Sequence, residues 1–205
     1  AGWSVTAPLT AAERLYCNRG VSGREGDPVN CVDWYTALGF CVWDAGPSGG
    51  GRLPTEAEWE YAGRGREVAE EGLTTGRTYP WGEQAVGVSC AEDGSGGARA
   101  RWDCRAGVGT VAVGMFAPSG GVYDLAGNVW EWTGDWYQAY GGSCWSAGSG
   151  GQSNPLCGEA GLNRVVRGGS WYYGLAVILR SASRVLFDPP YAFVFVGFRC
   201  SRTAF

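Results

Sequence analysis

Glycine divides this sequence into short segments and so limits the folds open to it. Of the 205 residues, 36 are Gly, which weakens helix and strand interiors but permits tight turns. Gly-rich stretches at 45–51, 85–110 and 141–163 separate the segments that have a regular pattern. The chain also has 11 Trp, whose rings fill irregular cores and whose N–H groups can donate to loop carbonyls. We therefore expect one domain of short elements and long loops.

Short helices are expected in the first third of the chain. Residues 10–19 can form one, and the apolar spacing of residues 31–42 predicts a second, with Asn30 as its N-cap. Thr55 and Glu58 match a capping box, which predicts the start of a third. From residue 66 onward we expect turns and short strands. The strand-like runs are 109–116, 121–125, 129–137, 164–173 and 193–200.

The residue types exclude several classes of function. The chain has no His, so it can hold neither a Ser-His-Asp triad nor a His-bound zinc or iron. Its formal net charge is −4 and its basic residues form no cluster, which argues against nucleic acid as a partner. Its apolar runs are too short for a membrane span.

The eight cysteines leave the redox compartment open. None is in a CxxC pair, which argues against a zinc ribbon. Two pairs flank short loops and suit disulfides of about 3 kcal/mol each, although free thiols in a reducing cytoplasm remain an alternative. Disulfides would indicate a secreted or cell-surface protein. We expect Cys31 and Cys41 to lie on a helix facing the core. The candidate pairs are Cys90 with Cys104 and Cys144 with Cys157.

Several motifs occur in one order and together resemble a known family. They are PVNCVDWYTALGFCVW at 28–43, RLPTEAEWEYAGRG at 52–65, YPWGE at 79–83, VGMFAPSGGVYDLAGNVWEWTGDWY at 113–137, RVVRGGSW at 164–171 and GFRC at 197–200. The set resembles the formylglycine-generating-enzyme/sulfatase-modifying-factor domain, a variant of the C-type lectin fold. The resemblance implies an α+β fold over residues 1–205, with small helices around a short, twisted, mainly antiparallel sheet and much irregular loop.

Most motif residues have a structural explanation. Arg167 and Arg199 lie in strand contexts and are expected to pair with Glu58, Asp124 or Asp135.

The family often binds calcium around the segment that matches LAGNVWE here. Calcium prefers carboxylate and carbonyl oxygens. No cofactor is expected to be required, and a structural calcium is one interpretation of this segment; the alternative is that its glutamate pairs with an arginine. The candidate calcium ligands are Gly127, Asn128, Val129 and Glu131.

The family's oxidase chemistry is not expected. The oxidase uses two cysteines just after the RGGS motif, and an apolar or aromatic side chain cannot replace a thiolate that binds copper. Here Tyr173 occupies the first position and Val177 or Ile178 the second, and no Cys occurs between Cys157 and Cys200. The paired carboxylates are interpreted as solvated rather than catalytic. They are Glu56, Glu58, Glu60, Glu70 and Glu71.

Residues 172–195, which we call the contact segment, are unusually apolar. They resemble the variable region of diversity-generating-retroelement proteins of bacteria and phages, which share the RGGSW, LRSA and GFRC motifs. Mutagenesis of AAY codons there yields NNY codons, which cannot encode Trp, Met, Lys, Gln or Glu, and residues 172–196 contain none of these. Leu179 and Phe198 are expected in the core. The expected contact residues are Tyr172, Tyr173, Leu175, Val177, Ile178, Ser183, Val185, Leu186, Phe187, Tyr191, Phe193 and Phe195.

The leading hypothesis is a non-enzymatic, ligand-binding variable protein whose contact residues converge on one exposed face. Their apolar character favours an apolar or aromatic-rich protein surface as the ligand, rather than a sugar or a nucleic acid. One alternative is an oxidase of the formylglycine-generating type. The other is a fixed accessory module of a larger signalling protein.

Overall fold

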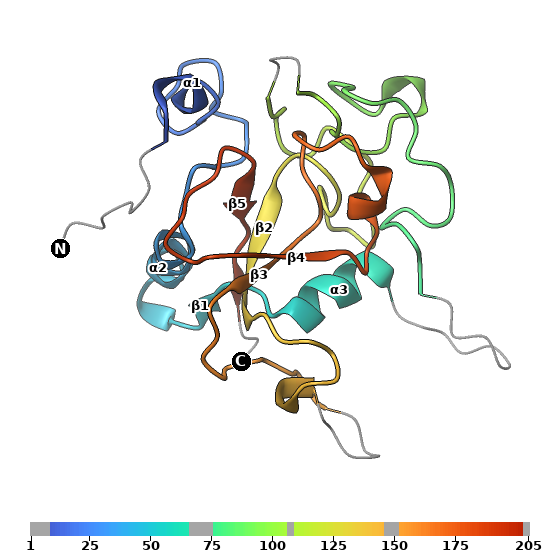
Figure 1. The fold of residues 1–205 in the computed structure, drawn as a ribbon. Helices are drawn as coiled ribbons and strands as arrows, with labels where there is room; N and C mark the ends of the chain where they lie inside the picture. Colours follow the sequence, from blue (N-terminus) through green and yellow to red (C-terminus); the bar gives the residue numbers. More distant parts are fainter. Residues whose placement is uncertain (1–8, 66–75, 106–108, 146–151, 203–205) are drawn as a thin grey trace, which may run out of the picture.

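The computed structural model of this chain describes residues 9–65, 76–105, 109–145 and 152–202. Within these ranges, short helices surround a small sheet, as expected for the α+β class (Figure 1). The helices are α1 (Ala11–Arg14), α2 (Trp34–Asp44) and α3 (Glu56–Arg64). The strands are β1 (Gly51–Arg52), β2 (Trp130–Trp136), β3 (Arg164–Arg167), β4 (Arg184–Phe187), β5 (Val196–Phe198) and β6 (Ser201–Arg202). The 3-10 helices are η1 (Gly46–Ser48), η2 (Ser95–Gly97), η3 (Ser143–Trp145) and η4 (Ala176–Leu179).

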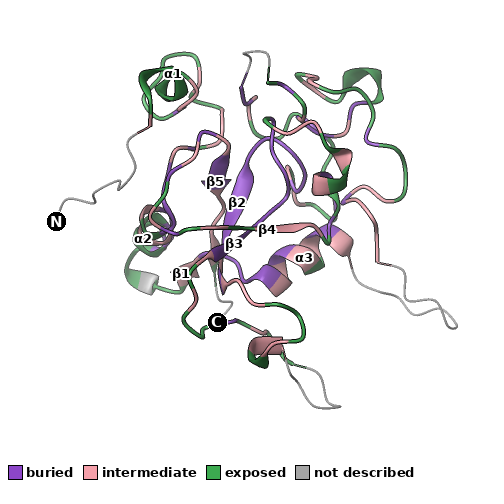
Figure 2. Cartoon of the chain, in the orientation of Figure 1, coloured by how far each residue is buried: buried purple, intermediate pink, exposed green. Residues whose placement is uncertain are grey.

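The main sheet has the strand order β4-β3-β2-β5. β3 pairs antiparallel with both β2 and β4, whereas β5 runs parallel to β2. β1 and β6 form a separate antiparallel pair. Figure 2 shows that burial is concentrated on β2, β3 and β5, while much of the surrounding loop is exposed. The sheet is thus mainly antiparallel, as predicted, with β4 at one edge.

Capping signals in the sequence predicted some helix starts correctly and others incorrectly. The Thr55 side chain accepts from the Glu58 amide at 3.1 Å and α3 begins at the next residue, which confirms the capping box. The first helix is also confirmed but is shorter than predicted, because only Ala11–Arg14 are α-helical. No helix in the described ranges is long and apolar enough to cross a bilayer.

The predicted N-cap of α2 was wrong. Asp33 caps this helix by accepting from the Thr36 amide at 2.7 Å. Asn30 is instead buried, and its side-chain amide donates to the carbonyls of Tyr16 at 2.7 Å and Val194 at 2.5 Å. Asn30 therefore joins distant segments, which its sequence neighbours do not reveal.

The strand predictions were correct for the three core strands. β2, β3 and β5 lie within the predicted runs 129–137, 164–173 and 193–200. The run 109–116 is not a strand; the Val111 amide donates to the Asn128 side chain and the Val113 amide donates to the Gly26 carbonyl. The run 121–125 contributes only an isolated bridge. β4 was missed, because its residues do not alternate between apolar and polar.

Tryptophan fills the core, as predicted from composition. The indole N–H of Trp132 donates to the Val32 carbonyl at 3.1 Å, and that of Trp34 donates to the Thr133 carbonyl at 2.7 Å. The fully buried members are Trp59, Trp130, Trp132 and Trp171. These bonds connect β2 to the segment that leads into α2.

All eight cysteines form disulfides. The two predicted short-loop pairs are confirmed. The expectation for Cys31 was wrong, because Cys31 lies outside any helix at φ 57°. Cys41 lies on α2 and is buried, as expected, and both residues are disulfide-bonded. Four disulfides are typical of proteins from oxidising compartments. The pairs are Cys17–Cys31, Cys41–Cys200, Cys90–Cys104 and Cys144–Cys157.

The two classes of disulfide are expected to differ in their effect on stability. Cys41–Cys200 spans 159 residues and Cys144–Cys157 spans 13. Loop-closure entropy predicts that the double Ala variant of the long bridge loses about 5 kcal/mol, against about 3 kcal/mol for the short one. Urea unfolding of the two variants measures the difference. Equal losses would contradict the entropic account.

Candidate binding surface

The contact segment connects β3 to β5 and contributes β4, the edge strand of the main sheet. After β3 the chain passes through η4, returns as β4 at the sheet edge and then leads to β5 (Figure 1). Each part of the segment is therefore placed beside a regular element. The segment begins immediately after Trp171, which is buried.

None of the twelve predicted contact residues is buried. Their exposure is graded rather than uniform, because seven are half-buried. The exposed five are Tyr172, Leu175, Val177, Leu186 and Tyr191, at 36%, 60%, 48%, 39% and 38%. The half-buried seven are Tyr173, Ile178, Ser183, Val185, Phe187, Phe193 and Phe195.

Other residues of the same segment point inward. Leu179 and Ser181 have no exposed area, and Ala192 and Val194 are buried at 4% and 6% exposure. Leu179 is thus a core residue, as predicted, whereas Phe198 is only half-buried. The segment therefore separates residues that anchor it from residues that it displays.

The half-buried contact residues also contribute to packing. Six of the seven, all but Ser183, are apolar or aromatic and pack against the core cluster that contains Trp132 and Val166. The expectation that the fold is indifferent to all twelve side chains is therefore too broad. Substitutions of these six residues are expected to change the packing of the core.

Six aromatic contact residues form a continuous row of rings. Centroid distances are 5.2 Å between Tyr172 and Phe195, 5.4 Å between Phe195 and Phe193, and 4.6 Å between Phe193 and Phe187. Such distances are typical of favourable aromatic pairs. We call these residues the aromatic row: Tyr172, Tyr173, Phe187, Tyr191, Phe193 and Phe195.

Arg105 lies over one end of the aromatic row. Its guanidinium carbon is 5.5 Å from the Tyr172 centroid and 5.9 Å from that of Tyr173, and its Nε donates to the Tyr172 carbonyl at 2.8 Å. Burial raises the pKa of the Tyr173 hydroxyl, and neighbouring Tyr172 raises it further, while Arg105 opposes the shift. Arg105 thus adds a positive charge to an otherwise apolar surface. Sequence reasoning missed this residue, which lies 67 positions from Tyr172.

The loop closed by the Cys90–Cys104 disulfide supports the start of the contact segment. The amide of Cys104 donates to the Trp171 carbonyl at 2.7 Å, and that of Asp103 donates to the Tyr173 carbonyl at 3.2 Å. Gly169 is needed just before this point, at φ 76°, because a Cβ there would lie 2.7 Å from a Leu179 methyl carbon.

A buried ion network holds the middle of the segment, where β4 begins. Arg167 has no exposed side-chain area and pairs with Glu60 and, at 3.6 Å, with Glu56. It also donates to the Ser183 carbonyl at 2.6 Å, and neighbouring Arg184 pairs with Glu56 at 2.6 Å. The partners expected for Arg167 were therefore wrong. The contact segment enters β4 from this network.

The expectation that the carboxylates are solvated was wrong for Glu56. It is 2% exposed, and burial raises its pKa while Arg167 and Arg184 act in the opposite direction. Glu58 is half-exposed and pairs with Arg52 at 2.6 Å, which lowers its pKa. Glu70 and Glu71 lie outside the described residues. Glu56, Glu58 and Glu60 are thus each engaged in an ion pair.

The candidate calcium ligands are engaged with protein groups. Both oxygens of Glu131 accept from Arg199, at 2.6 and 2.5 Å, and one also accepts from the Trp59 indole at 2.6 Å. Both polar atoms of the Asn128 amide bond to the Val111 backbone. The described residues contain no cluster of three or more Asp, Glu, Cys or His that could hold a metal. This arrangement does not fit calcium, because a cation at Glu131 would have to displace Arg199.

Comparison with known proteins places residues 2–204 in one family. They match the family model described as "Sulfatase-modifying factor enzyme 1-like domain". The chain is 35% identical to the formylglycine-generating enzyme of Thermomonospora curvata, over 88% of this chain and 57% of that protein. It is 36% identical to the mouse formylglycine-generating enzyme, over 87% of this chain and 45% of that protein. The chain thus spans about half the length of these relatives.

Solved structures share the fold at lower identity. Treponema denticola variable protein 1 superposes with a TM-score of 0.59 and 23% identity, over 88% of this chain and 73% of that one. PvdO from Pseudomonas aeruginosa gives 0.58 and 24%, over 87% and 63%. These matches confirm the C-type lectin-like fold of the formylglycine-generating-enzyme type.

Removing the central charge of the buried network is expected to be severe. Arg167→Met should lower the free energy of unfolding by about 3–5 kcal/mol, because Glu56 and Glu60 lose a buried counter-charge. The control is Arg202→Met, since Arg202 pairs with Asp44 at the exposed surface and should change stability by less than about 1 kcal/mol. Urea unfolding measures both. Similar losses of unfolding free energy in the two variants would contradict the idea that burial makes the ion pairs of Arg167 more costly to break than the surface pair of Arg202.

Proposed function

Because the chain belongs to the sulfatase-modifying factor enzyme 1-like family, we propose that it uses the family scaffold for binding rather than for catalysis. In this proposal the contact segment recognises a partner protein through exposed apolar and aromatic side chains. The observation that supports it is the separation of roles within residues 172–195: none of the twelve contact residues is buried, whereas Leu179, Ser181, Ala192 and Val194 are.

The state of the cysteines supports the absence of oxidase chemistry. Thiolates are the ligands that the oxidase needs for copper, and here all eight cysteines are in disulfides. Tyr173, at the position of the first oxidase cysteine, instead packs in the aromatic row, 5.3 Å from the Phe195 centroid. Formylglycine-generating enzymes are relatives of this chain, and the proposal departs from their activity on these grounds.

The apolar character of the surface favours a protein ligand. Tyr and Phe rings give a large contact area at low entropic cost, and binding hot spots are enriched in aromatic residues. The exposed Leu175, Val177 and Leu186 extend this apolar surface beyond the rings. We place the protein at the cell surface or outside the cell, because four disulfides are characteristic of oxidising compartments. The protein needs no cofactor in this proposal.

We further propose that the contact residues are diversified by a retroelement. The fold shared with Treponema denticola variable protein 1 supports this, as does the absence from residues 172–196 of the five amino acids that NNY codons cannot encode. A second candidate is a fixed module of a signalling protein. The serine/threonine-protein kinase pkn1 of Chlamydia pneumoniae is 35% identical over 85% of this chain, which covers 24% of that kinase.

The gene neighbourhood distinguishes these two candidates. Diversification predicts a second, near-identical copy of the sequence that encodes the contact segment, with adenines at codons of the twelve contact residues, beside a reverse transcriptase gene. Sequencing of the flanking DNA provides the measurement. A gene without this copy, fused to a kinase domain, would favour the fixed module.

Binding is expected to depend on the exposed contact residues. The chain is used as bait against a displayed library of secreted and surface proteins, and each isolated binder is tested with the triple variant Leu175→Ser, Leu186→Ser and Tyr191→Ser. Affinity should fall at least about 30-fold, because hot-spot residues each contribute about 2 kcal/mol or more.

A second triple variant controls for the loss of exposed apolar area. Leu15→Ser, Val88→Ser and Leu162→Ser remove side chains that are 74%, 56% and 87% exposed outside the contact segment. Affinity should change less than about threefold, which is under 1 kcal/mol. Equal losses in the two triple variants would contradict the proposed surface, as would a library that yields no binder.

A further inference from the structure

A cleft of about 590 Å³ lies beside the contact segment and is distinct from its side-chain surface. One wall comes from the N-terminal residues around α1, and the other from the residues that lead into α2. Ala192 adds the contact segment's only residue to the lining. A cleft of this volume is within the range of small-ligand sites.

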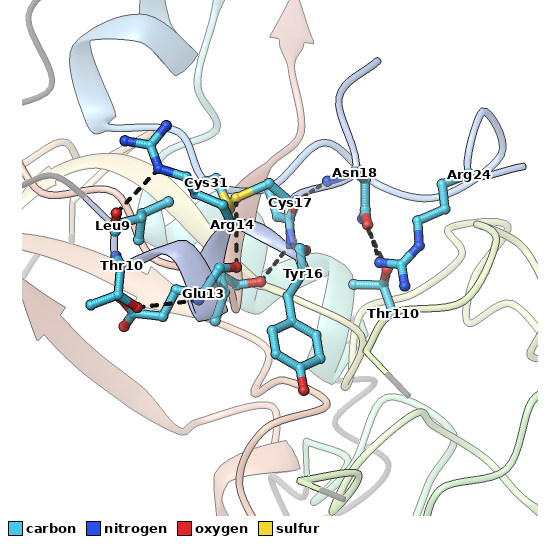
Figure 3. The surroundings of a disulfide bond; sticks show 12 residues. Leu9, Thr10, Glu13, Arg14, Tyr16, Cys17, Asn18, Arg24, Cys31 and Thr110 are labelled. Carbon is cyan, nitrogen blue, oxygen red and sulfur yellow. Dashed lines mark hydrogen bonds between the residues drawn. A yellow bond between two sulfur atoms is a disulfide. The ribbon is translucent and has the colours of Figure 1, made fainter. Parts of the chain in front are cut away.

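The cleft is held open by covalent and buried polar links between its walls. The Cys17–Cys31 disulfide joins the two walls directly (Figure 3). The Asn30 side chain accepts from the Asn18 amide at 2.8 Å and donates to the Val194 carbonyl at 2.5 Å. The Cys31 amide donates to the Phe193 carbonyl at 3.1 Å. The cleft is therefore preformed, which lowers the entropic cost of binding.

Two arginines line this cleft, and neither forms an ion pair with another described residue. The Nε of Arg14 donates to the Leu9 carbonyl at 3.2 Å, and its terminal nitrogens, which have no partner among the described residues, point away from the disulfide (Figure 3). Arg19 is exposed. Neither guanidinium lies within ion-pair distance of a carboxylate among the described residues. Elsewhere in the fold, arginines such as Arg167 and Arg199 are paired.

The nearby carboxylates are already engaged. Asp33 lines the cleft but is 4% exposed and accepts from the Thr36 amide at 2.7 Å as the cap of α2. Glu13 on α1 accepts from the amide and hydroxyl of Thr10 at 2.8 and 2.7 Å. The charged lining residues are therefore two arginines and one aspartate.

We propose that this cleft binds a carboxylate carried on an apolar body. Guanidinium groups bind carboxylates through charge-assisted, often bidentate hydrogen bonds. Leu9, Val21, Val32 and Ala192 supply apolar wall beside the two arginines. The ligand is either a small organic acid or an acidic residue with apolar neighbours in a protein segment, since both present the same chemistry.

The cleft is independent of the twelve contact residues, because none of them lines it. Its link to the contact segment is made by Ala192 and by backbone carbonyls bonded to Asn30 and Cys31. If the segment is diversified, as proposed above, every variant keeps the same carboxylate site. The claim that all variants share this site rests on the proposed function, whereas the proposal that the site binds a carboxylate does not.

Two probes with neutral counterparts test the inference. Phenylbutyrate is compared with phenylbutyramide, and the peptide acetyl-Leu-Asp-Leu-amide with its Asn analogue. Titration of the ¹⁵N-labelled chain is followed by backbone amide shifts of Val21, Val32 and Thr36. At least one acid should bind, at least about tenfold more tightly than its neutral counterpart, because hydrogen bonds to charged groups contribute more. Binding of only one probe identifies the source of the carboxylate.

Matched variants assign the binding to the two arginines. Arg14→Gln with Arg19→Gln should weaken the acid at least about tenfold, whereas Arg202→Gln, which removes a distant exposed charge, should not. The Leu175→Ser, Leu186→Ser and Tyr191→Ser variant should bind the acid as tightly as the unaltered chain. A failure of the proposed protein binding can therefore be distinguished from a failure of acid binding. Equal binding of acid and amide overturns the inference, as does unchanged binding in the double variant or no binding of either acid.

Discussion

The fold depends on placing a charged guanidinium where water cannot reach it. Arg167 is fully buried between α3, β3 and the start of β4, and it contacts Glu56, Glu60 and the Ser183 carbonyl. A buried ion pair adds little net stability, because desolvation opposes the attraction, yet an unpaired member is very costly. The network therefore acts mainly by disfavouring other arrangements of the chain. Arg167 has all of its partners only when α3 and β4 are both in place.

This constraint explains how an apolar segment can be displayed without collapsing. Arg167 and Arg184 fix the entry to β4, the loop closed by Cys90–Cys104 fixes residues 171–173, and Asn30 fixes residue 194. Between these points the backbone is held by groups outside the twelve contact residues. The half-buried rings still add packing, so the surface is a compromise in which the exposed residues vary at low cost and the inner rings do not.

Local sequence signals predicted local structure well. The Thr55–Glu58 capping box located α3 because every atom involved lies within four residues. The Cys90–Cys104 and Cys144–Cys157 pairs were predicted from their short loops of 14 and 13 residues, whereas Cys17–Cys31, which closes a loop of 14 residues, was not. Asn30 was predicted to cap α2, but its side chain bonds to the Val194 carbonyl, 164 residues away, and Asp33 caps the helix instead. The Cys41–Cys200 pair and the burial of Glu56 likewise depend on the tertiary fold.

The exposure of the contact residues could be predicted from the sequence for a related reason. Side chains that alternate with anchoring residues can be recognised when the motifs around them are familiar, and here Leu179 of the LRSA motif was predicted to be in the core, whereas Phe198 of the GFRC motif proved only half-buried. Arg105 and the arginine-lined cleft had no such signal, because each brings together residues from separate loops. If both proposals hold, the two surfaces differ in how they would recognise a ligand. The exposed contact residues could change without altering the core, whereas the cleft is built from residues held by disulfide and backbone links and would stay the same.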